Sequence, residues 1–262
     1  MTQKEQKCED TKKSLPEKDS PGKAPPALGY DTNVRVTVPN YDLFHCQTIQ
    51  LAAAYAKEKR KADDNILFPA RWLDTGCGTG NLILKARTIY PDCKFTLADP
   101  SVEMLQIAKQ KLLPAESEPN FEMDFRFVNL KTNQLDPIRT FSGQLFDIVT
   151  AVLSHHYLSQ EERIVAAENC FRLLTSGGIY ITFEHTAPVT TLGKEIGQRM
   201  VANFQADSGK NEKDIENYKN RYGKEYFPIT VAQHMDMLKD AGFKTVELFW
   251  YSYLEAGFYA VK

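Results

Sequence analysis

The sequence has few cysteines and no long hydrophobic run. Its 262 residues contain no Cys-x-x-Cys pair, and the five cysteines are scattered: Cys8, Cys46, Cys77, Cys93 and Cys170. This usage excludes a disulfide framework and a zinc ribbon. No stretch approaches the roughly 18 apolar residues of a membrane helix, and the charged first residues lack the apolar segment of a signal peptide. We therefore expect a reduced, cytoplasmic protein with no membrane partner.

Basic residues are not in excess. Lysine and arginine total 32 against 34 aspartates and glutamates, which gives a formal net charge of −2 at pH 7. Nucleic-acid binding needs a basic face that neutralises phosphates, so nucleic acid is not an expected partner and a small-molecule substrate is favoured. The composition, 42% hydrophobic and 25% charged, is that of a globular chain with one sizeable core. The sequence leaves a homodimer open.

Residues 1–29 are rich in charge and proline and have almost no large apolar side chains. Such a segment cannot bury enough apolar surface to offset the entropy lost on ordering. We predict a disordered N-terminal tail over 1–29, followed by one domain over 30–262.

Beyond the tail, runs typical of strands alternate with helical patterns. We expect strands at 71–75, 94–98, 125–129, 146–153, 179–183, 245–253 and 257–261, and helices at 41–57, 81–89, 100–113, 159–174 and 231–241. Alternating strands and helices predict an α/β fold: a Rossmann-like, doubly wound, mainly parallel seven-stranded sheet. The short turn between the last two strands predicts an antiparallel edge hairpin at the C-terminal end.

Local signals refine some of these boundaries. Ser159 and Glu162 form a capping box at the start of the helix at 159–174. Ile164 has the spacing of its apolar face, and Gly177-Gly178 is expected to end it. Pro100 is expected at the first position of the helix at 100–113.

Two regions are candidates for lids. The polar stretch at 188–226 is too long for a simple loop, so we expect it to be helical and to form a cap insertion. An N-terminal lid helix within 30–60 would join it in closing over a substrate.

The most informative segment follows the first strand. Asp74 ends that strand, and Gly76, Gly78 and Gly80 alternate before a helix begins. Glycines permit a tight turn and close approach of a ligand, while the helix N-terminus presents free N–H groups. The pattern G-x-G-x-G differs from the G-x-G-x-x-G of dinucleotide enzymes. Asp99 ends the next strand, where a carboxylate can accept both hydroxyls of a ribose.

These segments resemble class I S-adenosylmethionine (SAM)-dependent methyltransferases. The resemblance covers about residues 35–262 and rests on four stretches: 74–80 (motif I), 99–105 (D-x-S-x-E-M-L), 146–149 (motif IV) and 173–178 (the L-x-P-G-G turn). Thr175-Ser176 departs from the usual Lys-Pro. The resemblance implies SAM as cofactor, S-adenosylhomocysteine as product, and transfer of a methyl group to an O, N or S atom of a small molecule.

The resemblance also implies which residues hold the cofactor. Asn129 and Leu130 would border the adenine, and Val152 and Ser154 would flank the methionyl part. The full set of expected cofactor contacts is Tyr41, Asp74, Gly76, Cys77, Gly78, Gly80, Asp99, Pro100, Met104, Asn129, Leu130, Val152 and Ser154.

A narrower similarity links the V-P-x-Y stretch at 38–41 and the ending at 247–262 to the tRNA-uridine carboxymethyl-SAM synthases and related small-molecule methyltransferases. In that family the tyrosine of V-P-x-Y reaches the cofactor, which implies that Tyr41 does so here. Gly78 stands where the synthases carry a serine, and the nearest counterpart of their carboxylate-binding arginine is Arg221. We therefore favour an ordinary methyl donor. The alternatives are a carboxylated SAM derivative for tRNA, direct tRNA modification, and a non-catalytic SAM-binding protein.

Histidines follow the strand at 146–153, at the edge where open α/β sheets bind ligands. His155 or His156 could take a proton from the attacking nucleophile, because the pKa of imidazole lies near neutrality; otherwise one packs under the loop and the other is solvated. Tyr157 and His185 are candidates for the substrate wall. His45 lies on a predicted helix and is expected to be structural. No third ligand has metal-site spacing, so we expect no metal.

Overall fold

The computed structural model describes residues 25–62, 67–113 and 125–262. Most of the predicted tail, residues 1–24, lies outside the described residues. In chain order the helices (α, or η for a short 3-10 helix) and strands are α1 (Tyr30–Thr37), α2 (Tyr41–Ala62), β1 (Arg71–Thr75), α3 (Asn81–Ala86), β2 (Lys94–Ala98), α4 (Val102–Leu112), β3 (Phe125–Val128), η2 (Thr132–Gln134), β4 (Phe146–Val152), η3 (His155–Tyr157), α5 (Gln160–Leu173), β5 (Leu174–His185), α6 (Thr191–Asp207), α7 (Glu212–Asn220), α8 (Val231–Asp240), β6 (Thr245–Ser252) and β7 (Glu255–Val261).

The strands form one sheet in the order β3-β2-β1-β4-β5-β7-β6. The first five strands are parallel, and β7 runs antiparallel to both β5 and β6. This confirms the predicted seven-stranded sheet with its C-terminal hairpin. The strand order reverses between β1 and β4, so loops leaving the carboxyl ends of these two neighbours diverge and open a crevice for a ligand.

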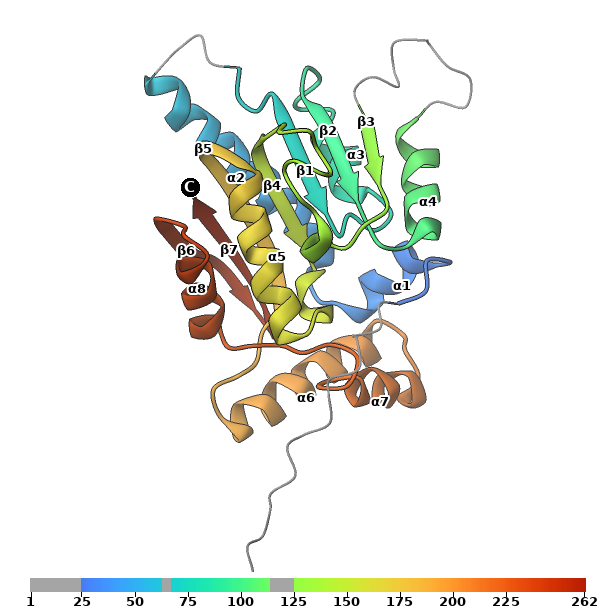
Figure 1. The fold of residues 1–262 in the computed structure, drawn as a ribbon. Helices are drawn as coiled ribbons and strands as arrows, with labels where there is room; N and C mark the ends of the chain where they lie inside the picture. The colour runs from blue at the N-terminus through green and yellow to red at the C-terminus, as the bar shows by residue number, and fades with distance from the viewer. Residues whose placement is uncertain (1–24, 63–66, 114–124) are drawn as a thin grey trace, which may run out of the picture.

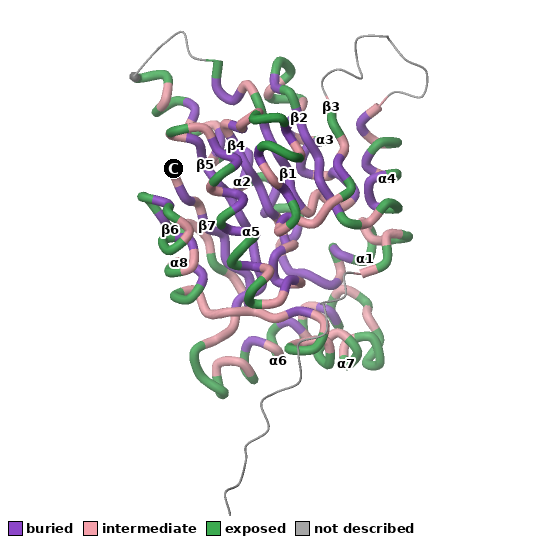
Figure 2. The backbone as a smooth tube through the Cα atoms, viewed as in Figure 1, coloured by how far each residue is buried: buried purple, intermediate pink, exposed green. Residues whose placement is uncertain are grey.

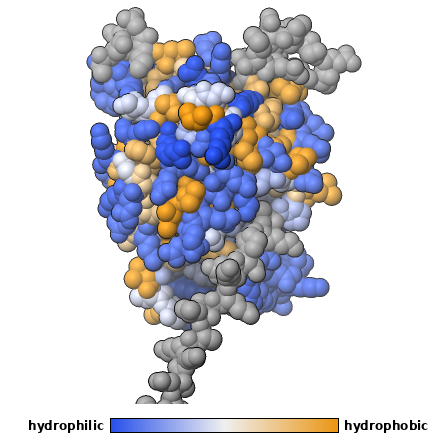
Figure 3. Space-filling model, in the orientation of Figure 1, coloured by the Kyte–Doolittle hydropathy of each residue, from blue (hydrophilic) through white to orange (hydrophobic). Residues whose placement is uncertain are grey.

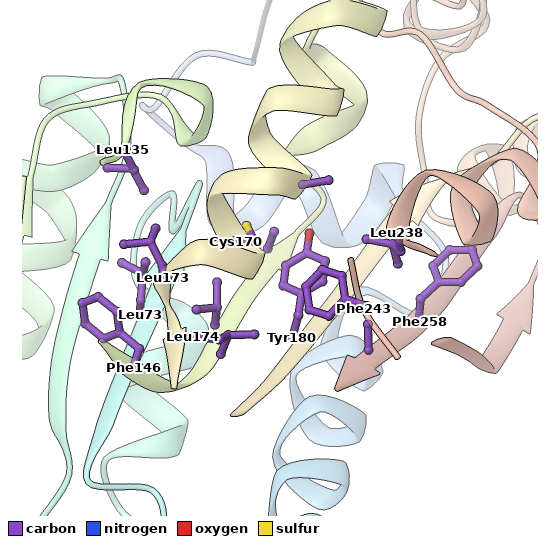
Figure 4. Close-up of a cluster of buried hydrophobic side chains, with 14 of the residues drawn as sticks. Leu73, Leu135, Phe146, Cys170, Leu173, Leu174, Tyr180, Leu238, Phe243 and Phe258 are labelled. Atoms are coloured by element: carbon purple, nitrogen blue, oxygen red, sulfur yellow. The ribbon is translucent and has the colours of Figure 1, made fainter. Parts of the chain in front are cut away.

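Helices cover both faces of the sheet (Figure 1). On one face α5 and α8 pack on buried side chains that include Cys170, Tyr180 and Leu238; Figure 4 shows these together with Phe243, whose ring stacks on that of Tyr180 with 5.8 Å between centroids. On the other face α2, α3 and α4 pack on a second cluster around Trp72. Burying both faces explains why the parallel strands read as nearly continuous apolar runs.

Three helices gather beyond the carboxyl ends of the parallel strands: α1, α6 and α7 (Figure 1). The segment at 188–226 is thus helical, as predicted. Figure 2 shows that the strands are mostly buried whereas much of α6 and α7 is exposed. Within the helical layer, the buried side chain of Gln205 on α6 donates a hydrogen bond to the carbonyl of Thr37 at the end of α1 at 2.9 Å. The site described below lies between this helical layer and the sheet.

The predicted N-terminal lid helix is two helices. The chain bends between α1 and α2 at Asn40, whose φ of 62° lies in the left-handed region. Asparagine tolerates this conformation better than most residues, since its short amide can bond locally. The bend lets α1 lie over the carboxyl edge while α2 continues along one face of the sheet.

Other boundaries also differ from the predictions. Helix α4 begins at Val102, and Ser101 is its N-cap, its hydroxyl accepting the Met104 N–H at 3.2 Å; the prediction that Pro100 starts this helix was wrong. Helix α5 has the predicted capping box but passes directly into β5, so Gly177 and Gly178 lie within a strand that runs from residue 174 to 185.

The predicted apolar face of α5 was also wrong at Ile164. Ile164 is 43% exposed, while Arg163 and Asn169 are buried. The guanidinium of Arg163 donates to the carbonyls of His155 and Phe227. This charged side chain therefore lies on the inner face of α5, where it connects two loops. Such a role has no signature in hydrophobic periodicity.

The face of the molecule in Figure 3 is largely hydrophilic, and its hydrophobic residues lie in separate patches. Among the described residues, no helix combines the length and the apolar character needed to cross a membrane.

Candidate functional site

The turn after β1 is built by glycines, each for a different reason. Gly76, Gly78 and Gly80 all have positive φ, at 65°, 54° and 77°. A Cβ on Gly76 would lie 2.3 Å from the Cβ of Ser154, so this position brings the turn against the end of β4. A Cβ on Gly80 would lie 3.1 Å from Ala108 on α4, whereas one on Gly78 would meet nothing within 4 Å. Gly78 therefore leaves its backbone open to a ligand.

Asp99 joins this turn to the end of β2. Its Oδ2 accepts the N–H of Gly78 and its Oδ1 accepts the N–H of Ser101, both at 2.9 Å. A carboxylate has about four lone-pair positions, so two bonds leave capacity for ligand hydroxyls. The side chain is buried, which raises its pKa, while the two backbone hydrogen bonds act in the opposite direction. The backbone thus fixes the carboxylate in place.

Asp74 supplies a second acidic group beneath the turn. Its Oδ1 accepts the hydroxyl of Thr150 at 2.7 Å. Burial raises the pKa of Asp74 to about 7, and the nearby charge of Asp99 contributes in the same direction. Two carboxylates in one wall favour a ligand that carries positive charge.

Around these groups lies a cleft with a volume of about 170 Å³. Most predicted cofactor residues line it: Tyr41, Asp74, Gly76, Cys77, Gly78, Asp99, Pro100, Met104, Val152 and Ser154. We refer to it as the cofactor cleft, and its position at the β1–β4 crossover is the one expected for an open α/β sheet.

Three predicted cofactor residues do not line the cleft. Gly80 packs against α4. Asn129 points its amide at the loop behind Asp99 and donates to the carbonyls of Asp99 and Pro100 at 3.0 and 2.9 Å, and Leu130 packs against the core. Lys131 and Thr132 take their place in the wall.

Tyr30 and His45 also line the cleft, although His45 was expected to be structural. Tyr41 and His45 lie one turn apart at the start of α2, with 4.9 Å between their ring centroids, and both face the cleft. Burial lowers the pKa of His45 to about 3, so it is neutral at pH 7. The position of the start of α2 beside the cleft was not evident from the sequence.

Helix α1 is fastened over the cleft by Asp31. Its carboxylate accepts the Thr79 hydroxyl at 2.6 Å and the Asn81 amide at 2.8 Å, and it pairs with Lys111. Thr79 and Asn81 flank Gly80 in the glycine turn. We call this set the α1 latch, because it connects the helix that covers the cleft to the turn that forms the cleft.

A smaller cavity of about 40 Å³ adjoins the cofactor cleft and shares Tyr30, Leu153 and Tyr157 with it. We name it the side chamber; its wall also includes Val34, His156, His185, Tyr218 and Arg221. The predicted substrate residues Tyr157 and His185 are both in this wall. Leu153 has a φ of 54° at the boundary of the two cavities; strained backbone of this kind often occurs at functional sites.

The two adjacent histidines point to different partners. The Nδ1 of His155 lies 3.2 Å from the Tyr180 hydroxyl, whereas the Nδ1 of His156 lies 2.6 Å from Glu184. His185 contacts Glu255 through its Nδ1 at 3.0 Å. Glu184 was not predicted as a site residue, although it follows an apolar strand run in the same way as Asp74 and Asp99 do.

A family model described as a methyltransferase domain matches residues 73–180, from the strand that ends in Asp74 to β5. The chain contains a class I SAM-dependent methyltransferase domain. Its fold is that of solved methyltransferases: the plantazolicin methyltransferase in complex with a substrate analogue and S-adenosylhomocysteine aligns with a TM-score of 0.61 and 14% identity, covering 90% of both chains. Magnesium protoporphyrin IX methyltransferase from Synechocystis PCC 6803 with bound SAM aligns with a TM-score of 0.53 and 17% identity, covering 89% of this chain and 91% of that one.

Among curated proteins, the chain is distantly similar to carboxy-S-adenosyl-L-methionine synthases. That of Citrifermentans bemidjiense is 22% identical over 231 residues, which is 87% of either chain. That of Campylobacter lari is 25% identical over 181 residues, 68% of this chain and 71% of the relative.

The residues of the cofactor cleft fit SAM. Gly78 presents an open backbone, Asp99 keeps hydrogen-bonding capacity for hydroxyls, and the carboxyl groups of Asp74 and Asp99 complement a cation. Within the described ranges, no cluster of His, Cys, Asp or Glu side chains has the arrangement of a metal site.

Proposed function

We propose that this protein transfers the methyl group of SAM to a nucleophilic atom of a small molecule. The observation that carries the proposal is the position of Asp99: a buried carboxylate, fixed by the N–H groups of Gly78 and Ser101, in a cleft at the crossover of the sheet. A fixed acceptor at this point suits the ribose hydroxyls of an adenosyl group.

The remaining walls suit the other parts of SAM. The turn from Gly76 to Gly80 would hold the methionyl part, with Val152 and Ser154 beside it. Tyr41 would close the cleft from α2. Cys77 in the same turn has its pKa raised well above the usual thiol value by burial, so it is a neutral wall residue and not a nucleophile.

The cofactor supplies the reactive methyl group, so the protein mainly has to orient the acceptor and exclude water. Such positioning can contribute up to about 7–11 kcal/mol of barrier reduction. The side chamber supports this role because it shares wall residues with the cofactor cleft and its wall includes residues of α1 and α7. An acceptor in the chamber would be covered by helices 30–37 and 212–220, which we propose act as lids, with helix 191–207 packed on both.

Removing the Asp99 carboxylate tests the proposal. We expect Asp99→Ala to weaken SAM binding by about 1.5–3 kcal/mol, because charge-assisted hydrogen bonds are lost; this corresponds to roughly a 10- to 150-fold higher Kd. Isothermal titration calorimetry measures it directly.

Asp147 offers a matched control. Its Oδ2 also accepts two backbone N–H groups, from Ala70 and Arg71 at 2.8 and 3.0 Å, but at the opposite end of the sheet. Asp147→Ala should affect stability and leave the SAM affinity unchanged. Unchanged SAM affinity in a folded Asp99→Ala variant would refute the assignment of Asp99.

A second candidate is synthesis of a carboxylated SAM derivative, which the similarity to carboxy-S-adenosyl-L-methionine synthases over 87% of the chain favours. Arg221 lines the side chamber, where a carboxylate attached to the cofactor's sulfonium could reach it. Mass spectrometry of the ligand released from freshly purified protein separates the two functions. Carboxylated SAM supports this candidate, and SAM or S-adenosylhomocysteine supports ordinary methyl transfer.

A further inference from the structure

We propose that His156, held by Glu184, is the general base of the reaction, and that the acceptor is a small neutral molecule that brings an O–H or S–H group into the side chamber. The inference rests on the proposed methyl transfer and specifies its acceptor. Glu184 is a positioning residue, because it acts through the histidine.

Glu184 is surrounded by donors. Its Oε1 accepts the N–H of His155 at 3.0 Å and the hydroxyl of Thr182 at 3.2 Å. Its Oε2 accepts the N–H of His156 at 2.9 Å and lies 2.6 Å from the Nδ1 of the same residue. Burial by itself would raise the pKa of Glu184, but the His156 hydrogen bond and the neighbouring histidines lower it below its usual range. The group is therefore an ionised acceptor.

An ionised carboxylate fixes the tautomer of His156. Because Glu184 can only accept, the proton of the neutral imidazole must be on Nδ1, and Nε2 then carries the lone pair. His156 is 1% exposed and lines the side chamber. Its Nε2 is buried and has no hydrogen-bond partner among the described residues. A buried acceptor of this kind at a cavity wall is suited to the O–H or S–H of a ligand.

His155 does not have this arrangement. Its Nδ1 faces Tyr180, its ring is stacked on the Tyr180 ring with 6.3 Å between centroids, and Glu184 meets only its backbone N–H. The Nε2 of His155 is also buried without a partner among the described residues, but His155 lines the cofactor cleft, so the turn η3 places one histidine in the wall of each cavity. Arg163 holds that turn by donating to the carbonyl of His155 at 3.0 Å.

The groups around His156 favour a neutral acceptor. His185 lies 4.6 Å from it between ring centroids, Tyr157 4.3 Å and Tyr226 6.0 Å. From the other walls, Tyr30, Tyr218 and Arg221 face the same chamber. Arg221 is paired with Glu225 at 2.5 Å, so the two charges largely offset each other. The rest of the wall combines aromatic and aliphatic side chains with the uncharged polar side chains of Asn33 and Thr37.

The protonation state of His156 suits the step. Burial lowers its pKa to about 4, the adjacent His185 acts in the same direction, and Glu184 opposes both, so His156 is neutral at pH 7. In the reaction the oxygen or sulfur of the acceptor bonds to the methyl carbon, the carbon–sulfonium bond breaks, and its electron pair stays on the sulfur. The acceptor's proton passes to Nε2 of His156. That proton becomes strongly acidic as the new bond forms, so a weak base facing an ionised Glu184 is sufficient.

The experiment combines one spectroscopic and two functional measurements on the full-length protein. In wild type with ¹⁵N-labelled histidine, NMR at pH 7 should show His156 protonated on Nδ1 and not on Nε2. SAM affinity is measured by calorimetry, and release of S-adenosylhomocysteine is measured with phenol, benzyl alcohol and thiophenol as probe acceptors.

Glu184→Gln is the critical variant. The glutamine amide can donate to Nδ1, which moves the proton to Nε2 and removes the acceptor; in Ser-His-Asp enzymes a wrong tautomer of this kind costs about 10⁴-fold in kcat. We expect at least a 100-fold lower kcat, a nearly unchanged KM and an unchanged Kd for SAM. His234→Gln is the matched control, since His234 is also buried with an unpartnered Nε2 but lies on α8 against Phe258, outside both cavities. It should behave like wild type.

The outcomes separate the two proposals. If wild type does not bind SAM, the proposed function is wrong. If it binds SAM but His156 carries its proton on Nε2, or Glu184→Gln keeps the wild-type kcat, the base assignment is overturned. If SAM binds and none of the probes is methylated, the acceptor class is overturned. The NMR measurement needs no variant, so it decides the role of Glu184 even if Glu184→Gln fails to fold.

Discussion

The cofactor cleft and the side chamber adjoin each other but are built in different ways. The cleft depends on backbone: glycines with positive φ, and a carboxylate, Asp99, bound by two N–H groups. The chamber depends on buried side chains, among them His156 in its wall, which is held by Glu184 behind it. Its wall comes from α1, η3, β5 and α7, which are far apart in the sequence. A site made of backbone groups can bind any ligand that carries the same common part. A site made of side chains can differ in its residues from one substrate to another.

Buried acids and buried histidines differ in their electrostatics. Burial raises the pKa of Asp74 under the cleft to about 7, while it lowers the pKa of His155, His156 and His234 to about 4. Acidification therefore neutralises the charge of Asp74, whereas it forces protons onto histidines that the fold keeps neutral. The two kinds of group should respond to pH in opposite directions.

The largest effect we expect is loss of stability in acid. The histidines have an ordinary pKa of 6.5, and in the fold His45, at about 3, joins the three at about 4. Between these values the unfolded chain binds more protons than the fold, so the free energy of unfolding falls as the pH is lowered through 6.5 towards 4. Each such proton contributes up to about 1.4 kcal/mol per pH unit. Urea unfolding from pH 7.5 to 4.5 should show a decrease of several kcal/mol.

Two variants resolve the contributions to that decrease. Asp74 binds its proton in the folded state between pH 7 and 3.8, which offsets part of the loss, so Asp74→Asn should make the decline steeper. His234→Gln should make it shallower. A flat profile between pH 6.5 and 4.5, or a shallower one in Asp74→Asn, would show that the buried acid and the buried histidines do not oppose each other.

The next effect concerns the backbone of the cleft. Gly76→Ala should lower the free energy of unfolding by about 3 kcal/mol, because a left-handed alanine costs about 1 kcal/mol and overpacking against Ser154 about 1–3 kcal/mol more. Gly78→Ala, with nothing within 4 Å of the new Cβ, should cost only about 1 kcal/mol of stability. Urea denaturation measures both.

A double variant tests the cause. Ser154→Gly removes the atom that the Gly76→Ala methyl group meets, so Gly76→Ala/Ser154→Gly should recover most of the overpacking cost. Equal losses in Gly76→Ala and Gly78→Ala would mean that the close approach of the turn to β4 is not what the first glycine provides.

The same contrast explains what could be predicted from the sequence. The sheet, the glycine turn and Asp99 were predicted because each is encoded over a few consecutive residues: an apolar run, a glycine spacing, an acid at a strand end. Asn129 and Leu130, expected at the adenine, lie outside the wall of the cleft, which Lys131 and Thr132 line instead, because the resemblance places a turn but not the direction of its side chains.

The chamber was largely unpredictable. Its wall joins residues 30, 156, 185, 218 and 221, and no local pattern relates positions so far apart. Tyr157 and His185 were found only because they follow strands. Glu184 could have been predicted by the pattern that identified Asp74 and Asp99, an acid at the end of an apolar strand. The strand was expected to end at residue 183, so Glu184 was placed in a loop. His45 was assigned by its helix, and its place over the cleft depends on where α2 packs.

The smallest effect concerns the α1 latch, which connects the two regions because Tyr30 on α1 lines both cavities. Asp31→Asn removes a charge that accepts from Thr79, Asn81 and Lys111. The latch is partly exposed, so we expect a cost near 1 kcal/mol and not the larger value of a buried network. SAM affinity should fall about fivefold, and amide hydrogen exchange should increase over 30–37. Glu58→Gln is the control: Glu58 pairs with Lys61 within α2 and makes no hydrogen bond or ion pair with α1 in the described part of the chain, so loss of this exposed ion pair should leave both readouts near wild type. If Asp31→Asn changes stability but neither SAM affinity nor exchange in α1, the helix is fixed by its packing on α6, and it covers the cleft without responding to the cofactor.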